Sequence, residues 1–225
     1  MSFRQFWREN WPLWRVLAAL ASTGCLALLW FRVHISAGSL LYRWLVVPNL
    51  ALAWIPLLCA VALRYVWRRK PAVTVSAVAF FALWLLFLPN APYVVTDLVH
   101  LTYLKSKVPA HYDVLLNAFT ALTALVAGHI SLYVVHELLL SRLHAWSSWL
   151  VVAGLLALSS VGVYIGRFLR WNSWDLFHSP LAIAGDSLHV LTQREALLFI
   201  GLFAFCQIFS YLVVYTCLRF RAAES

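Results

Sequence analysis

Charged side chains are scarce in this chain. Only 11% of its 225 residues are Asp, Glu, Lys or Arg, whereas 64% are hydrophobic. Soluble globular domains carry about 25% charged residues, so a soluble domain of this composition could not cover its surface. The composition excludes a disordered chain, a secreted disulfide scaffold and a soluble enzyme. It predicts a membrane protein with several spanning helices and short loops.

Several other signals are missing as well. The sequence has no P-loop, no HExxH helix and no serine nucleophile elbow that would name a reaction. Its four cysteines form no CxxC pair and lie in apolar runs, so we interpret them as small buried apolar residues: Cys25, Cys59, Cys206 and Cys217. No Gly/Ser linker or convincing repeat divides the chain, and we expect residues 1–225 to form a single integral membrane domain.

Acidic residues are few, eight against seventeen basic ones, which gives a net charge of +9. The basic side chains flank the apolar runs, as membrane topology and contact with lipid headgroups require. No basic surface is left over for nucleic acid. The partner that we expect is the lipid bilayer, and a homo-oligomer or a second membrane protein stays open.

Six apolar runs predict an all-α bundle of six transmembrane helices, at about residues 14–31, 41–61, 72–94, 113–140, 146–169 and 195–218. With six crossings, ten Lys and Arg fall on the side of the termini and seven on the opposite side. The cluster Arg68-Arg69-Lys70 strengthens this bias. We therefore predict cytoplasmic termini and a location in the inner (plasma) membrane. Pro89 and Pro92 should end or break the third helix, because proline cannot donate to the helix ladder.

Two stretches, residues 87–101 and 164–175, concentrate the polar side chains. The first joins the third and fourth helices and the second follows the fifth, so both should lie at the same, extracytoplasmic end. An ionisable group at membrane depth costs about 2.5–3.5 kcal/mol on insertion scales, and such groups face each other or water. The sequence thus predicts a polar pocket lined by Asp, Arg and His. The alternative is a set of salt bridges that only seals the bundle.

The candidate residues are those whose chemistry suits such a pocket. Carboxylates and imidazoles can act as general acids or bases, and the catalytic candidates are Asp97, His100, Asp113 and Asp175. Arginine can hold a phosphate or carboxylate with two parallel hydrogen bonds, and the substrate-binding candidates are Asn90, Tyr93, Thr96, Asn117, Tyr164, Arg167, Arg170, Trp171 and Asn172. Spacings of three and four place Tyr164, Arg167 and Trp171 on one face if the fifth helix continues. Gly162 and Gly166 form a small-xxx-small pair, which allows close helix contact.

A metal site is a weaker hypothesis. Asp97-Leu-Val-His100 and Asp175-Leu-Phe-His178 each place Asp and His on one face of a helical turn, and both are metal ligands. The commoner alternative is that each Asp caps a short interfacial helix or pairs with an arginine. We assign no metal, and the cofactor remains unknown.

Five short motifs follow one another in a fairly specific order and spacing: Leu88-Pro-Asn-Ala-Pro-Tyr93, Thr96-Asp97-Leu98 with His100, Tyr112-Asp113, Leu132-Tyr133 with His136, and Gly166-Arg167-Phe168 with Arg170-Trp171-Asn172-Ser173-Trp174-Asp175. This pattern resembles the signature of a family of uncharacterised bacterial integral membrane proteins, domain of unknown function 1361. The resemblance covers roughly residues 80–180. It implies a multi-helix inner-membrane protein and brings no established activity, cofactor or catalytic residue.

Three functions stay open at this point. An enzyme acting on a lipid or headgroup-linked substrate predicts a pocket that opens to lipid or water. A small transporter predicts a polar path through Asn117, His129, Tyr133 and Gln207. A structural or accessory subunit predicts polar groups that satisfy one another and leave no accessible cavity.

Overall fold

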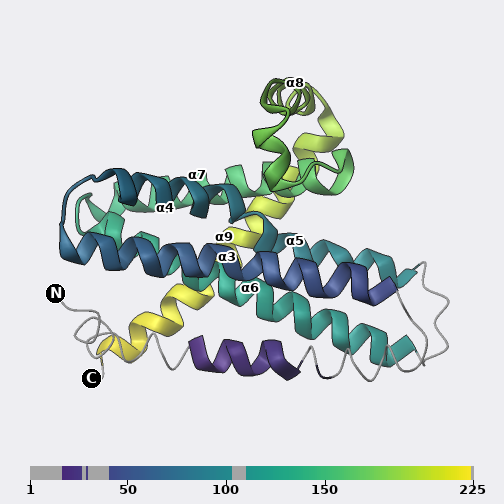
Figure 1. The fold of residues 1–225 in the computed structure, drawn as a ribbon, viewed down its shortest axis with the longest axis horizontal. Coiled ribbons are helices and arrows are strands. Elements are labelled where there is room, and N and C mark those ends of the chain that lie inside the picture. Colours follow the sequence, from purple (N-terminus) through teal and green to yellow (C-terminus); the bar gives the residue numbers. More distant parts are fainter. Residues whose placement is uncertain (1–16, 27–28, 30–40, 103–109, 224–225) are drawn as a thin grey trace.

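The structure, a computed structural model, describes residues 17–26, 29, 41–102 and 110–223 (Figure 1). All regular structure within those residues is helical. Five helical segments in this part of the chain are long and apolar enough to cross a membrane: Pro48–Arg69, Val75–Val99, Val114–Leu140, Ala145–Leu169 and Arg194–Arg219. The protein is therefore an all-α, multi-pass membrane protein. The first predicted helix falls partly outside the described residues, and its described part, Leu17–Leu26, is helical.

The elements follow one another in a simple order: α3 (Leu41–Arg69), α4 (Val75–Phe87), α5 (Asn90–Thr96), the 3₁₀-helix η1 (Asp97–Thr102), α6 (Ala110–Leu140), α7 (Ala145–Tyr164), the π-helix η2 (Ile165–Leu169), the 3₁₀-helix η3 (Ser173–Phe177), α8 (Pro180–Val190) and α9 (Arg194–Ala223). The predicted break at Pro89 is confirmed, since α4 ends at Phe87 and α5 begins at Asn90.

Two boundaries differ from the sequence prediction. Helix α3 continues to Arg69, about two turns past the predicted end at residue 61. Its last turn carries Arg68 and Arg69. Their positive charges stabilise the negative C-terminal end of the helix dipole, and their long side chains can extend toward the membrane interface. Helix α8 was not predicted at all. It has 11 residues, with Pro180 in its first turn, and is too short to register as a spanning helix.

Helices α3, α6 and α7 and the α4–α5 pair run side by side, and α9 crosses them obliquely (Figure 1). Helix α6 is central, because 67% of its membrane-spanning window is buried, against 22–39% in the other spanning segments. The α3–α4 and α6–α7 loops share one end, which we call the basic end after Arg68, Arg69, Lys70 and Arg142. The opposite end, where α5 meets η2, is called the polar end.

The core near the basic end is aromatic and closely packed. Trp84, Leu132, Val152 and Tyr211 are buried in one cluster, and the indole Nε1 of Trp84 donates to Ser131 Oγ at 3.1 Å. The prediction that the cysteines are buried is wrong for three of the four, and the fourth, Cys59, is only partly buried. Those three are exposed on helices, where a thiol behaves as a small apolar group toward lipid: Cys25, Cys206 and Cys217.

Candidate functional site

The polar end begins with the interrupted helix between α4 and α5. Asn90 Nδ2 donates to the carbonyl of Phe87 at 3.1 Å, and Ser173 Oγ donates to the carbonyl of Leu86 at 3.3 Å. Buried backbone carbonyls need partners, above all in a membrane. The second polar stretch thus supplies a hydrogen bond to the backbone that the first one breaks. Asn90 Nδ2 also donates to Ser173 Oγ at 2.9 Å and joins the two directly.

Glycines let α5 sit tightly between α6 and α7. A Cβ added to Gly162 would lie 2.6 Å from Pro89 Cγ, and one added to Gly128 of α6 would lie 2.6 Å from Ala91 Cβ. Gly166, one turn beyond Gly162, lies against the ring of Tyr93. Gly162 of α7 and Gly166 of η2 therefore face Pro89 and Tyr93, in the close contact that the small-xxx-small pattern predicted.

An ion pair joins the two polar stretches. Arg167 Nη1 lies 3.1 Å from Asp97 Oδ1, and the two side chains are only 12% and 9% exposed. Asn49 Nδ2 of α3 donates to Asp97 Oδ2 at 2.7 Å, and the guanidinium of Arg167 lies 5.9 Å from the centroid of the Tyr93 ring. Asp97 is thus held from α3 and from η2. Sequence reasoning missed Asn49, because an Asn beside Pro48 in an apolar run carries no motif.

The end of α7 has an unusual backbone. The helix passes into the π-helix η2, and Arg170 closes it in the left-handed region with φ 62° and ψ 27°. Left-handed backbone costs a non-glycine residue roughly 1–2 kcal/mol, and π-turns often occur at functional sites. The turn also corrects one prediction: Tyr164, Arg167 and Trp171 do not share a face. Tyr164 packs on Phe199 of α9, with ring centroids 5.7 Å apart, whereas Arg167 reaches Asp97.

Asp175 has a structural role in this arrangement. Its Oδ2 accepts hydrogen bonds from the backbone N–H of Asn172 at 2.7 Å and from Asn172 Nδ2 at 3.1 Å. Asn172 and Asp175 form a capping box at the start of η3. Nearby, Trp171 Nε1 donates to Asp186 Oδ2 of α8 at 2.8 Å. The two aspartates therefore follow the alternatives foreseen for them: Asp97 pairs with an arginine and Asp175 caps a helix.

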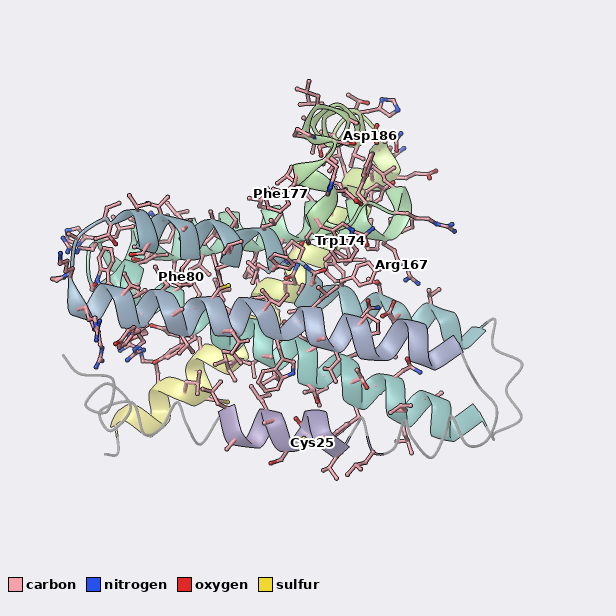
Figure 2. The ribbon with its side chains drawn as sticks, in the orientation of Figure 1. Cys25, Phe80, Arg167, Trp174, Phe177 and Asp186 are labelled. Carbon is pink, nitrogen blue, oxygen red and sulfur yellow. The ribbon has the colours of Figure 1, made fainter. Side chains whose placement is uncertain are left out.

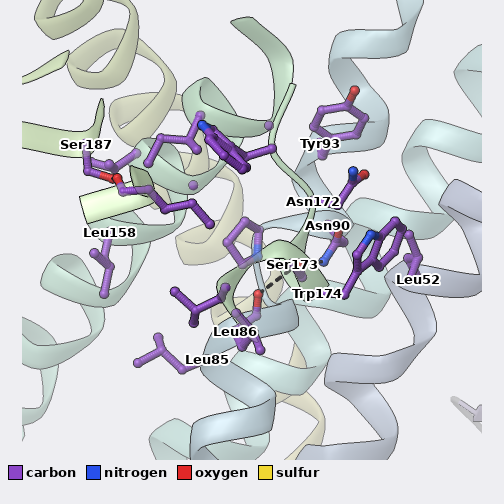
Figure 3. Close-up of a pocket in the computed structure, with 18 of the residues that line it drawn as sticks. Leu52, Leu85, Leu86, Asn90, Tyr93, Leu158, Asn172, Ser173, Trp174 and Ser187 are labelled. Carbon is purple, nitrogen blue, oxygen red and sulfur yellow. Dashed lines mark hydrogen bonds between the residues drawn. The ribbon is translucent and has the colours of Figure 1, made fainter. Parts of the chain in front are cut away.

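A cavity of about 640 Å³ lies beside this junction, between α4, α7 and the η3–α8 segment (Figure 3). Its wall is mostly apolar, with Leu85, Leu86 and Leu158 among the lining residues. Its polar lining groups are Asn49, Asn90, Tyr93, Asn172, Ser173 and Ser187, together with the indoles of Trp171 and Trp174. Figure 3 shows Tyr93, Asn90 and Asn172 on one side and Leu85 and Leu158 on the other. Most of the amide and phenol groups therefore lie on one side of the cavity and most of the leucines on the other, although Leu52 lies with the amides and Ser187 lies beside Leu158.

The sequence candidates take different places around this cavity. Four of them line it: Asn90, Tyr93, Trp171 and Asn172. Asp97 and Arg167 lie just outside the wall, because the Arg167 guanidinium lies over the ring of Tyr93, which lines the cavity. Thr96 Oγ1 donates to the carbonyl of Tyr93 at 2.7 Å. Asn117 is buried in α6. Arg170 is exposed. The side chains of His100 and Asp113 lie outside the described residues.

The described residues contain no group of three or more His, Cys, Asp or Glu that could hold a metal ion. His178 Nδ1 lies 3.2 Å from the carbonyl of Trp174 and is exposed. The pairing of the two Asp/His motifs around one ion remains an untested prediction, since it needs the imidazole of His100.

The comparisons with known proteins give a match to a family model. No curated protein and no solved structure matches the chain. One family model matches residues 48–210, a range that begins one residue before Asn49, ends at Ser210 of α9, and includes Asp97, Arg167 and the whole cavity wall. Because this match covers well over half of the sequence, the chain belongs to the family described as Protein of unknown function (DUF1361).

Proposed function

We propose that the protein binds a membrane amphiphile in the cavity and acts as an enzyme on its polar head. The observation that carries this proposal is the mixed wall, in which an apolar group of leucines lies opposite a group of amides. Leu85, Leu86 and Leu158 suit an acyl or isoprenoid chain, and Asn90 and Asn172 suit a headgroup. A volume of about 640 Å³ lies in the range of roughly 300–1,000 Å³ that small-molecule sites occupy.

The wall also indicates how such a ligand arrives. Ala82 and Leu158 line the cavity and are exposed. Both belong to segments that span the membrane, Val75–Val99 and Ala145–Leu169. An opening between exposed apolar side chains at that depth faces lipid rather than water. A lipid or headgroup-linked substrate therefore fits better than a water-soluble one.

The proposed chemistry uses Arg167 and Asp97, which lie beside Tyr93 at the edge of the cavity. Arginine carries five N–H donors in a planar fork, so Arg167 can hold Asp97 and an anionic headgroup together. Arg170, exposed beside it, is a second cation for a phosphate or carboxylate. Asp97 is the proposed general base, with His100 and Asp113 as further candidates. Asp175 and Asn172 position η3, and with it Ser173, at the polar side of the cavity.

The second candidate function is a small transporter, which buried polar contacts between α6, α7 and α9 favour. Gln207 Nε2 donates to Ser160 Oγ at 2.7 Å, and Tyr211 and His136 are hydrogen-bonded at 2.9 Å. These groups extend the polar character from the cavity level toward the basic end. A structural or accessory role is the third candidate, and the cavity supports it least.

We also propose the finer topology. Leu17–Leu26 would belong to a sixth crossing, with the basic end and both termini in the cytoplasm of a cell whose inner membrane holds the protein. Arg68, Arg69, Lys70 and Arg142 at one end support this orientation. The test is a reporter enzyme, fused after Ser225, that is active only outside the cytoplasm. Activity of this reporter would contradict the proposed topology.

A matched pair of variants on α7 tests lipid binding. Leu158 lines the cavity and Leu150 does not, yet they are exposed to similar fractions, 52% and 57%. Purified variants are reconstituted in vesicles of phosphatidylethanolamine and phosphatidylglycerol, extracted, and the retained lipid is measured by native mass spectrometry. Leu158→Trp should lose most retained lipid, because the larger indole obstructs the cavity. Leu150→Trp should keep it.

Equal lipid retention in the two variants contradicts the proposal. Activity separates the first two functions. An enzyme changes the lipid composition of cells that overproduce the protein, and Asp97→Asn abolishes that change while the variant still folds. A transporter instead moves its substrate between vesicle compartments without altering it.

A further inference from the structure

The η3–α8 segment stands apart from the bundle. In Figure 1, α8 is seen nearly end-on, whereas α3, α6 and α7 lie across the view. Its axis is therefore roughly perpendicular to the spanning helices and parallel to the membrane plane. With 11 residues, α8 is about 16 Å long and cannot cross a hydrocarbon core of about 30 Å.

Helix α8 has an inner apolar face toward the bundle. Ile183 and Ser187, one turn apart, line the cavity together with Leu191 just beyond the helix. Val190 is buried against Ala196 at the start of α9. This face accounts for the attachment of α8 to the bundle.

A second apolar face points the other way and has no partner in the described residues. Leu181 and Leu188 are 87% and 68% exposed, and they lie two turns apart on the helix. Ala184 and Gly185 lie between them and are also exposed. The neighbouring η3 adds exposed Phe177. Water would have to solvate this whole strip if α8 stood outside the membrane.

The polar residues of α8 occupy one edge. Asp186 and His189 lie between the two apolar faces, and Asp186 accepts the hydrogen bond from Trp171, which follows the end of α7. Figure 2 shows Asp186 on the same side as Arg167, toward the polar end, with Phe177 on the opposite side. The polar edge of α8 therefore faces the water at the polar end, and its apolar strip faces sideways.

From this arrangement we infer that α8 lies in the membrane interface, with Leu181, Leu188 and Phe177 among the acyl chains of the leaflet at the polar end. The occupant of the strip is lipid, because the strip continues the lipid-facing surface of the neighbouring spanning helices and carries no charge. Trp174 of η3 lines the cavity, is 45% exposed, and sits at the headgroup level that tryptophan prefers. The inner face of α8 then forms one wall of the opening through which an amphiphile reaches the cavity. This last role rests on the proposed function, whereas the membrane position of α8 does not.

Spin labels on two adjacent residues test the position of α8. Leu188→Cys and His189→Cys are made in a background in which the four native cysteines are alanine, and each labelled protein is checked for an unchanged melting temperature. The proteins are placed in vesicles of phosphatidylethanolamine and phosphatidylglycerol. Collisions with oxygen, which concentrates in lipid, are compared with collisions with a water-soluble nickel chelate.

The expected result is a high oxygen-to-chelate ratio at 188 and a lower ratio at 189. A label at 188 that the chelate reaches freely would place α8 in water and overturn the inference. A label at 188 that both probes miss, with dipolar broadening between labels on different chains, would mean that a second copy covers the strip, and would overturn it too. None of these readings depends on a ligand, so the lipid-retention assay with Leu158→Trp can fail independently.

Discussion

Two ion pairs of equal length stand at opposite ends of the bundle. Arg167 and Asp97 at the polar end and Arg219 and Glu137 at the basic end both have N···O distances of 3.1 Å. The first pair is 12% and 9% exposed and the second 49% and 33%. Exposed pairs contribute little because water screens them, whereas a charge left alone after its buried partner is removed costs a great deal. Burial, and not distance, decides what each pair does.

The backbones of the two ends differ in the same sense. Near the basic end α6 and α9 run without interruption, and Trp149 of α7 packs against the rings of His136, Tyr211 and Tyr215 from those two helices. At the polar end α4 breaks and α5 passes into the 3₁₀-helix η1, while α7 turns into a π-helix that the 3₁₀-helix η3 follows. Irregular backbone at membrane depth is tolerated where it is buried in protein or lines a cavity. The cavity lies at the irregular end.

The largest expected effect comes from breaking each pair in turn. Arg167→Gln should lower the free energy of unfolding by about 3–5 kcal/mol, because it removes the cation that faces the buried Asp97 carboxylate. Arg219→Gln should cost about 1 kcal/mol or less. Both are measured by reversible unfolding in mixed micelles. The double variant Arg167→Gln/Asp97→Asn should recover part of the loss, and equal costs at the two ends would contradict the comparison.

A smaller effect is expected from glycines on α7. Gly162→Ala brings Cβ within 2.6 Å of Pro89 Cγ, while Gly154→Ala, toward the basic end, meets nothing within 4 Å. Overpacking of this kind costs roughly 1–3 kcal/mol, so Gly162→Ala should lower the thermal midpoint and Gly154→Ala should leave it unchanged or raise it. Similar losses in both variants would show that α5 does not pack as tightly on α7 as the structure places it.

The smallest effect concerns the left-handed residue of the polar end. Arg170→Gly should stabilise the fold by about 1 kcal/mol, because glycine adopts φ 62° without the steric cost that other residues bear. Arg170→Ala keeps that cost and should not stabilise. If Arg170 also binds a headgroup, both variants lose retained lipid in the native mass spectrometry assay. A less stable Arg170→Gly would mean that its side-chain contacts outweigh the strain.

Sequence patterns anticipated the polar end unevenly. The run from Leu88 to Pro92 predicted the break in the helix, because two prolines remove backbone donors wherever they occur. Counting crossings brought Asp97 and Arg167 to one end without any knowledge of packing. The sequence could not predict that Asn49 donates to Asp97 or that the side chain of Tyr164 points toward Phe199. The contact of Asn49 depends on which turn of α3 lies beside Asp97. The relative directions of Tyr164, Arg167 and Trp171 depend on the π-helix η2, which rotates the residues that follow Tyr164.

Helix α8 shows the same limit. Its 11 residues carry too little periodicity to separate a helix from a loop, and its two apolar faces depend on what lies beside it. Likewise, Asp175 could have been a ligand, an ion-pair partner or a cap. Only the extended backbone of Asn172, with φ −100° and ψ 160°, made it a cap.

The sequence by itself determined that this is a helical membrane protein, that its third predicted helix breaks at Pro89, and that its two polar stretches lie at one end. Hydrophobicity and proline chemistry are local properties, and lipid enforces them strongly. The tertiary structure alone decided which side chains of those stretches pair, which line the cavity and which merely cap a turn. Those outcomes depend on helix rotation and on contacts within a few ångströms, which residues far apart in the chain settle together.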